Sequence, residues 1–380
     1  MDESDRCRTC LERPSSPESA PDQTDGVVAL TDVATLQDLH VLKKKNQRRA
    51  LIAVVGTGLV FIVSFIACIS VGNYHASISD VFKALIGNHE DDTLVTMIQN
   101  VRLPRVISAA AVGAALSVAG LSMQSLFKNP MASPSVLGIS SGASLGASVA
   151  ISFGMGSAVF GDYATSAMAC IMCFLTLLLV YSIARSKYGI STVTLLLAGV
   201  AVGAFFNGLV SLLQYVADDD TLGAIVYWTM GSFNKVTWDS FNRSIILLLA
   251  GVVSQILIYR ELNMISAGEE QASNLGVNVK TVRYAALIGT ALCVGGSVAI
   301  AGTIGFVGLI VPHIFRLIVG PNHKLLIPMC IFGGAAFLML MDTLAKTAFT
   351  MSFPVGIFTS LLGAPFFIYI LKTRKKEIWE

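Results

Sequence analysis

The sequence predicts an all-α protein that crosses a membrane with about ten helices, and three observations support this prediction. The chain of 380 residues is 54% hydrophobic and only 13% charged, with a mean hydropathy of +0.70. Long apolar segments recur from residue 50 almost to the last residue. The ionisable residues gather between these segments, as expected where charged side chains are costly inside lipid.

The N-terminal residues 1–49 are expected to form a cytoplasmic tail. Up to residue 42 they are rich in Asp, Glu, Ser, Thr and Pro and contain no long apolar run, a composition typical of disordered segments. No short basic region followed by an apolar core begins the chain, so the tail does not resemble a signal peptide. Cys7 and Cys10 form a Cys-x-x-Cys pair without a second pair or histidines nearby, which favours free thiols over a metal or redox role.

Ten apolar segments of about 17 to 24 residues follow, and each is long enough to cross a bilayer core at about 1.5 Å of rise per residue. They are residues 50–71, 104–127, 134–155, 163–185, 191–213, 240–259, 281–302, 303–319, 325–345 and 354–371. Between 281 and 319 the sequence leaves two alternatives open. Gly302 and Gly305 mark either a tight turn between two spans or a bend in one long helix.

The positions of Lys and Arg indicate the orientation of the chain. Five of them (Lys43, Lys44, Lys45, Arg48 and Arg49) precede the first span, and most of the others fall on the same side when the spans are counted alternately. The positive-inside rule therefore predicts that both termini are cytoplasmic. Residues 50–372 then form the transmembrane domain, and residues 373–380 form a cytoplasmic C-terminal tail.

Two arginines stand against this charge pattern. Arg102 and Arg105 lie at the outer start of the second span, where the helix dipole and the positive-inside rule both disfavour cations. Being three residues apart, they share a helix face and are predicted to form one basic spot that meets an acidic partner. The alternative is that they hold lipid phosphates at the membrane surface.

Glycines at four-residue spacing in the third span indicate close helix packing. Gly138, Gly142 and Gly146 fall on one helix face, where the absence of side chains lets another backbone approach within lipid. We interpret this pattern as packing and not as phosphate binding.

The sequence shows no catalytic constellation and no metal-ligand cluster, so we expect neither an enzyme nor a bound cofactor. No GxxxxGK[ST] phosphate loop is present, so the chain does not bind ATP by that device. His313 stands alone in its span, which favours a packing or hydrogen-bonded role over metal binding. Arg316, one turn further along, is expected to reach the membrane surface.

A transporter without its own nucleotide site needs a surface on which a motor can act. The inner loop 260–281 contains Glu269 and Glu270 in a stretch able to form short helices, and it is the candidate for this surface. On sequence pattern alone a solvated connector is an equally good interpretation.

Several motifs in order resemble the FecCD-type permeases, the membrane subunits of ABC importers for iron complexes and cobalamin. They are RLPR (102–105), MQSLFKNPMASPSVLGISSGAS (123–144), GEEQASNLGV (268–277), AGTIGFVGLIVPHIFRLIVG (301–320), DTLAK (342–346) and GAPFF (363–367). The resemblance covers about residues 55 to 372. The family usually has Leu where this chain has Met131, and Arg where it has Lys346. A pair formed by Asp342 and Lys346 at helical spacing is the structural alternative for that last motif.

The resemblance implies a type II ABC importer permease in the cytoplasmic membrane of a prokaryote. The expected partners are a separate ATPase, a soluble or lipid-anchored binding protein outside the cell, and a second permease chain, most simply another copy. No nucleic acid is expected. By the family's motifs, the binding protein docks on Arg102, Arg105 and Lys346. The ATPase couples through Gly268, Glu269, Glu270, Ala272, Leu275 and Gly276. The cytoplasmic gate contains Asn129, Met131, Thr192 and Val193.

The expected cargo is a ferric siderophore or haem, with cobalamin as the alternative within the family. The rival from another class is a secondary transporter driven by an ion gradient. Such a protein would favour charged or strongly polar residues at the membrane midplane, often on broken helices. In this chain the ionisable residues cluster at the ends of the predicted spans.

Overall fold

The computed structural model describes residues 48, 50–72, 77–186, 189–348 and 352–373. The predicted tails, with Cys7 and Cys10, lie almost entirely outside these residues. The first helix spans Ala50–Ser70. The elements that follow are α2 (Ile78–Ile86), α3 (Asp92–Thr96), the π-helix η1 (Met97–Arg102), α4 (Leu103–Leu126), η2 (Pro134–Leu137), α5 (Ile139–Phe153), α6 (Ser157–Phe160), η3 (Gly161–Tyr163), α7 (Ala164–Ala184), β1 (Arg185–Ser186), β2 (Gly189–Ile190), α8 (Thr192–Val216), α9 (Asp219–Thr229), α10 (Trp238–Leu257), α11 (Tyr259–Ala267), α12 (Glu269–Asn274), α13 (Val279–Ala301), α14 (Val307–Val319), α15 (His323–Thr347) and α16 (Val355–Thr373).

Each of the ten predicted spans corresponds to an apolar helix. In the described part of the chain, seven helices are long and apolar enough to cross a membrane, and three apolar helices are shorter. The shorter ones are Ile139–Phe153, Val307–Val319 and Val355–Tyr369. The predicted span 134–155 is shorter as an α-helix because its first residues form the 3₁₀ turn η2.

The alternatives between 281 and 319 resolve into two helices. α13 ends at Ala301 and α14 begins at Val307, with an irregular segment between them. Phe306 has a positive φ of 66°, a conformation that ends any continuous helix at this point.

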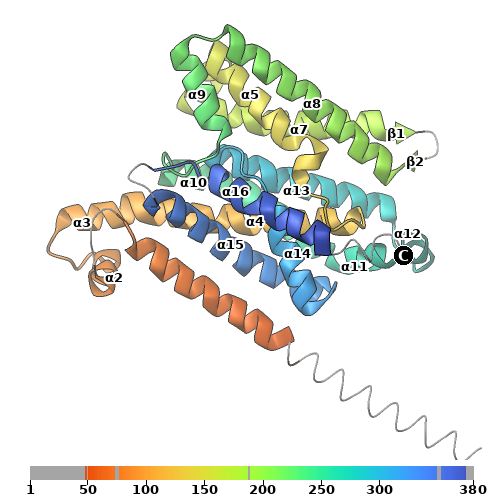
Figure 1. Cartoon of the computed structure of the whole chain (residues 1–380), viewed down its shortest axis with the longest axis horizontal. Coiled ribbons are helices and arrows are strands. Elements are labelled where there is room, and N and C mark those ends of the chain that lie inside the picture. The colour runs from red at the N-terminus through yellow and green to blue at the C-terminus, as the bar shows by residue number, and fades with distance from the viewer. Residues whose placement is uncertain (1–47, 49, 73–76, 187–188, 349–351, 374–380) are drawn as a thin grey trace, which may run out of the picture. The chain divides into compact units, whose positions relative to one another are not determined.

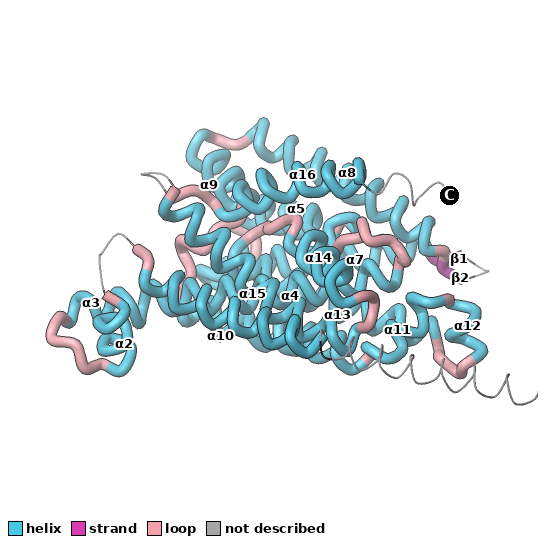
Figure 2. Tube along the Cα trace, turned by 60° about the horizontal axis from the view of Figure 1, so that its bottom comes forward, coloured by secondary structure: helices cyan, strands magenta, loops and turns pink. Residues whose placement is uncertain are grey.

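α4 is the central helix. Most of its residues are buried, and it packs against α10, α13, α14 and α15 (Figure 2). Its glycines explain how the helices come so close. A Cβ placed on Gly120 would lie 1.8 Å from the carbonyl oxygen of Gly308 in α14, and one on Gly113 would lie 2.2 Å from that of Gly334 in α15. Small residues of this kind are what allow helices to pack within lipid.

A second group of helices contains α5, α7, α8 and α9, and Figure 1 shows α5 beside α7 and α8. The predicted packing of the spaced glycines is confirmed. Gly138 faces the backbone of α8 at Gly199 and Gly203, while Gly142 and Gly146 face α7. α7 also packs against α13, which joins this group to the helices around α4.

The exposed faces of several spans are apolar. Of the 18 most hydrophobic consecutive residues of the first helix, 22% are buried inside the chain. The corresponding share for the helix that includes α4 is 78%. Leu51, Leu59 and Val63 of the first helix are each more than half exposed. Such faces fit a lipid environment. Among the described residues, the strands are β1 and β2, which pair with each other in antiparallel fashion.

Candidate functional site

The predicted gate and coupling residues meet at one end of the membrane domain. We call this the hairpin end and define it by β1 and β2, the turn 128–134, α11 and α12. A cavity of about 600 Å³ opens there. It is lined by Leu126, Phe127, Lys128, Asn129, Thr192, Val193, Leu196, Gly268, Glu269, Glu270 and Gln271. Three of the four predicted gate residues and three of the six predicted coupling residues are in this list, whereas Met131 is not.

The turn 128–134 is built by backbone and side-chain hydrogen bonds of Asn129. After α4 ends, Lys128 takes a left-handed conformation with φ 48°. The Asn129 Oδ1 atom then accepts a hydrogen bond from the Met131 backbone N–H at 2.9 Å, and the Asn129 carbonyl accepts one from Ala132 at 3.0 Å. An asparagine that folds its own turn in this way fixes the chain direction locally. Pro134 then begins η2.

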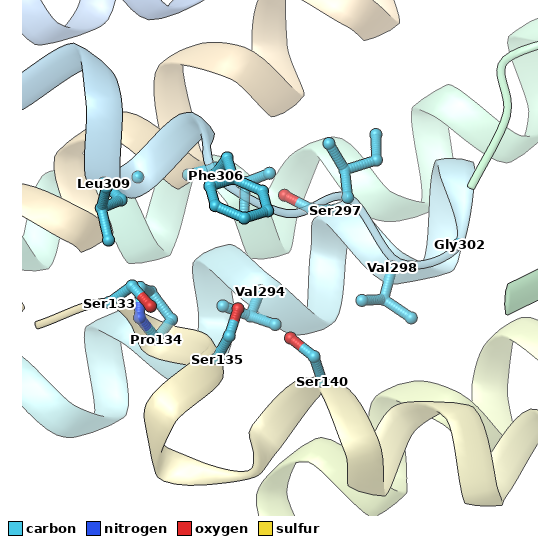
Figure 3. A pocket seen from close by; sticks show the side chains of 13 residues that line it. Ser133, Pro134, Ser135, Ser140, Val294, Ser297, Val298, Gly302, Phe306 and Leu309 are labelled. Atoms are coloured by element: carbon cyan, nitrogen blue, oxygen red, sulfur yellow. The ribbon is translucent and has the colours of Figure 1, made fainter. Parts of the chain in front are cut away.

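A small cavity lies directly behind this turn (Figure 3). Its volume of about 20 Å³ is room for about one water molecule. Ser133, Ser135 and Ser140 face it from the turn and α5, and Ser297 faces it from α13. The turn is therefore incompletely packed against the helices behind it.

The loop 260–281, which we call the coupling loop, contains the short helices α11 and α12, as the sequence predicts. α11 ends before Gly268. At the end of α12 the Val277 N–H donates to the Ala272 carbonyl oxygen, and Gly276 between them has a positive φ of 86°. Ala272 is fully buried, so its role is to hold α12 against the domain. Leu275 is 72% exposed.

An ion pair fixes the start of α12. Arg283 of α13 donates from Nη2 to Glu269 Oε1 at 2.8 Å. The Arg283 side chain is only 11% exposed, whereas that of Glu269 is 37% exposed. Glu269 is therefore held against the domain, while Glu270, Leu275 and Gly276 are exposed.

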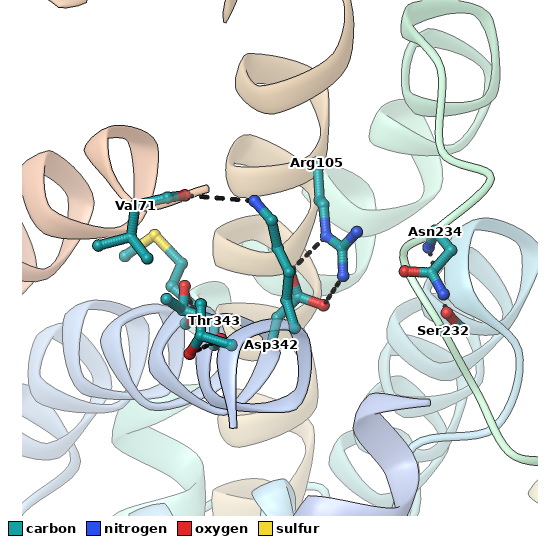
Figure 4. A network of polar contacts seen from close by, with 9 residues as sticks. Val71, Arg105, Ser232, Asn234, Asp342 and Thr343 are labelled. Carbon is teal, nitrogen blue, oxygen red and sulfur yellow. Dashed lines mark hydrogen bonds and ion pairs between the residues drawn. The ribbon is translucent and has the colours of Figure 1, made fainter. Parts of the chain in front are cut away.

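The other predicted site lies at the opposite end of α4, which we call the arginine end and define by Arg102, Arg105, Asp342 and Lys346. Arg105 of α4 binds Asp342 of α15 in a bidentate pair, with Nε to Oδ2 at 2.6 Å and Nη2 to Oδ1 at 2.9 Å (Figure 4). The two side chains are 13% and 7% exposed. Lys346 donates from Nζ to the carbonyl oxygen of Val71 at 3.2 Å.

Arg102 is buried at the arginine end. Its Nη1 donates to the carbonyl oxygens of Ile69 and Ser70, at 3.2 and 3.1 Å, where the first helix ends. Only 4% of its surface is exposed, so the prediction of one basic spot formed by Arg102 and Arg105 is wrong for Arg102. The helical pair of Asp342 with Lys346 is also not formed as an ion pair, because Arg105 takes the carboxylate. Spacing within one helix cannot reveal a partner that another helix supplies.

Comparison with known proteins identifies the family. The model of the FecCD transport family matches residues 60–373. The chain belongs to this family. The hemin transport system permease protein HmuU of Yersinia pestis is 35% identical over 323 residues, which cover 84% of this chain and 96% of HmuU. The cobalamin import system permease protein BtuC of Halobacterium salinarum is 39% identical over 284 residues, 75% of each chain.

A solved structure described as an inward-facing conformation of a metal-chelate type ABC transporter shares the fold of this FecCD chain. The two are 31% identical with a TM-score of 0.75, over 84% of this chain and 98% of the solved one. The all-α permease architecture predicted from the motifs is thus confirmed. Membership of a transport family makes the chain a permease subunit and not itself a catalyst.

Proposed function

We propose that this chain is the membrane subunit of an ABC importer that moves an iron chelate, either a ferric siderophore or haem, into a prokaryotic cell. The hairpin end faces the cytoplasm and receives a separate ATPase, and the arginine end faces outward and receives a binding protein. Both termini are cytoplasmic. Residues 50–372 carry the transport function between the tails 1–49 and 373–380.

The single observation that supports this proposal most is the cavity at the hairpin end. Asn129 comes from the turn after α4, Thr192 from the start of α8, and Glu269 from α12, yet all three line the same 600 Å³ space. A motor that moves α12 therefore acts next to the turn and the helix start that form the gate. ATP hydrolysis on the partner is in this way linked to opening of the pathway.

The charge of the arginine end supports docking of an acidic binding protein there. Its defining residues are three cations and one carboxylate, so the cluster has an excess of positive charge. Arg105 and Lys346 are partly buried, whereas Arg102 is buried, so Arg105 and Lys346 are the cations that an acidic partner could reach. A positive patch steers an acidic partner and sets its orientation.

The exposed face of α8 supports pairing with a second copy across the pathway. Ala201, Ala204, Gly208 and Ser211 follow at spacings of three and four, and all are exposed in this chain. Small and weakly polar residues in a lipid-level helix favour an approaching helix or a solute over lipid tails. In this proposal the pathway lies between two copies, along their α8 helices.

The haem and metal-chelate relatives support iron chelates as cargo, and the cobalamin relative makes cobalamin the second candidate. The test is to purify the chain from its native membrane with its associated proteins. ATP hydrolysis of that assembly is then measured against ferric siderophore, haem and cobalamin presented on the binding protein. Stimulation by an iron chelate is expected. Stimulation by cobalamin alone would make cobalamin the cargo in place of an iron chelate. Purification of the chain without an ATPase would contradict the proposal that it belongs to an ABC importer.

A further inference from the structure

A buried chain of polar side chains connects the coupling loop to the end of α4. Asn263 lies on α11, His323 begins α15, and Ser125 lies one residue before the end of α4. His323 Nδ1 is 2.6 Å from Asn263 Oδ1, and His323 Nε2 is 2.7 Å from Ser125 Oγ. Arg316 of α14 donates from Nη2 to the same Ser125 oxygen at 3.2 Å. Its guanidinium is therefore held inside the protein, contrary to the expectation that it reaches the membrane surface.

The hydrogen-bond partners fix the state of the imidazole ring. Asn263 Oδ1 also accepts from the His323 backbone N–H at 2.9 Å, which identifies it as the amide oxygen. Nδ1 must therefore carry the ring proton in order to bond to that oxygen. Nε2 is then the acceptor for the Ser125 hydroxyl. A proton on both nitrogens would place a second cation beside the Arg316 guanidinium, which disfavours the charged ring.

The Ser125 hydroxyl has a second acceptor available. The carbonyl oxygen of Leu121, one turn earlier in α4, lies 2.9 Å from Ser125 Oγ. A hydroxyl has one proton, so it donates either to the His323 ring or to Leu121. In the first arrangement the end of α4 is tied to α15 and through it to α11. In the second arrangement α4 is closed on itself and the tie is released.

Burial excludes a catalytic role for Ser125 and His323. Ser125 is 0% exposed and His323 is 1% exposed, so no substrate reaches the hydroxyl. Buried polar groups are costly unless they are paired, and a fully paired network holds the elements that it joins in one arrangement. The elements joined here are α11, which belongs to the loop 260–281, and α4, which leads directly into the turn 128–134.

We propose that Asn263, His323 and Ser125 form the connection through which movement of the coupling loop reaches the gate turn. This inference rests on the proposed function. When the ATPase displaces α11, Asn263 moves the imidazole ring, the Ser125 hydroxyl changes acceptor, and the end of α4 is released with the turn that follows it. The three are positioning residues, and none of them touches cargo or nucleotide.

The test uses the reconstituted complex of this chain with its ATPase and binding protein. Ser125→Ala removes the switching hydroxyl, and Asn263→Leu breaks the chain at its other end. Ser125→Thr keeps the hydroxyl. Ser148→Ala is the matched control, because the Ser148 hydroxyl is equally buried but donates only to Ser144 in its own helix. Two quantities are measured: cargo moved per ATP hydrolysed, and hydrogen exchange of residues 259–276 and 127–138 with and without a non-hydrolysable ATP analogue.

In the wild-type complex the nucleotide is expected to change exchange in both segments. In Ser125→Ala and Asn263→Leu the change in 259–276 persists, while the change in 127–138 and the cargo moved per ATP both fall by about tenfold, within the factor of about 5 to 150 usual for coupled sites. The double variant falls no further than either single variant, because both break the same connection. Ser125→Thr and Ser148→Ala keep the wild-type values.

Wild-type cargo per ATP in Ser125→Ala and Asn263→Leu would overturn the inference while leaving the importer intact. Failure of the proposed function is a different result, since the wild-type chain would then show no ATP-linked transport at all. If one variant does not assemble, the other tests the same connection from the opposite end.

Discussion

Breaking the ion pair between Arg105 and Asp342 should destabilise the domain strongly, and unequally from its two sides. Asp342→Ala removes the carboxylate that receives two charge-assisted hydrogen bonds from a side chain only 13% exposed. Removing one partner of a buried pair typically costs about 3–5 kcal/mol, because the other charge stays buried without compensation. Arg102 and Lys346 act electrostatically on the same cluster, so their repulsion adds to this cost.

Arg105→Ala should cost less, about 1–3 kcal/mol, because Lys346 stays near the carboxylate and compensates part of its charge. Replacing both partners by apolar side chains of similar size, Arg105→Met with Asp342→Leu, should cost about 1 kcal/mol or less. This order follows from the contacts that join α4 to α15. It does not depend on any partner protein.

The assay is the free energy of unfolding in mixed micelles with increasing SDS, followed by circular dichroism. Thr343→Ala is the control on the same helix, since the Thr343 hydroxyl donates to Met339 one turn earlier and takes no part in the ion pair. A cost below about 1 kcal/mol for Asp342→Ala would refute the reasoning, because an intact buried pair cannot be removed so cheaply. That result would mean that Arg105 is presented at the surface, as the sequence suggested.

The other predictions concern helix packing and the coupling loop. Gly120→Ala should abolish the folded state or cost several kcal/mol, measured in the same unfolding assay, because the new Cβ meets the Gly308 carbonyl. Gly223→Ala in α9 meets no atom within 4 Å and should stabilise that helix by about 0.5–1 kcal/mol. Leu275→Asp should weaken ATPase binding at least about tenfold in a pull-down titration without changing unfolding, since its side chain is exposed. Gly276→Trp should lower cargo-linked ATP hydrolysis. Wild-type ATP hydrolysis in this variant would show that Gly276 does not belong to the proposed ATPase contact.

The sequence predicted the apolar helices well because hydrophobic length is a direct physical requirement for crossing lipid. The packing of Gly142 and Gly146 was also predictable, since glycine at helical spacing has few other uses within a membrane. The choice between the two alternatives near Gly302 was not predictable, because the positive φ values of Gly302 and Phe306, 70° and 66°, are not visible in the sequence.

Partners from other helices were the main feature that the sequence could not show. Asp342 is 237 residues from Arg105, and nothing in its local pattern distinguishes that partner from Lys346. The connection of Asn263, His323 and Ser125 joins three separate helices in the same way. Ser125 lies within the motif 123–144, which was the one available signal, but the motif does not say what its hydroxyl contacts.

The coupling residues divide into two kinds that the motif alone does not separate. Ala272 is buried and Glu269 is held by Arg283, so both shape the loop. Glu270 and Leu275 are exposed and are therefore the better candidates for contact with an ATPase. Burial, which depends on the fold, makes this distinction.

The central claim is that ATP hydrolysis at the hairpin end drives import through this chain. The most direct measurement is uptake of radioactive iron, as ferric siderophore or haem, into proteoliposomes that hold the chain and its ATPase, with the loaded binding protein added outside and ATP enclosed. The account predicts uptake that requires enclosed ATP and is unaffected when proton and sodium gradients are collapsed. Uptake that follows an ion gradient and proceeds without the ATPase would contradict it.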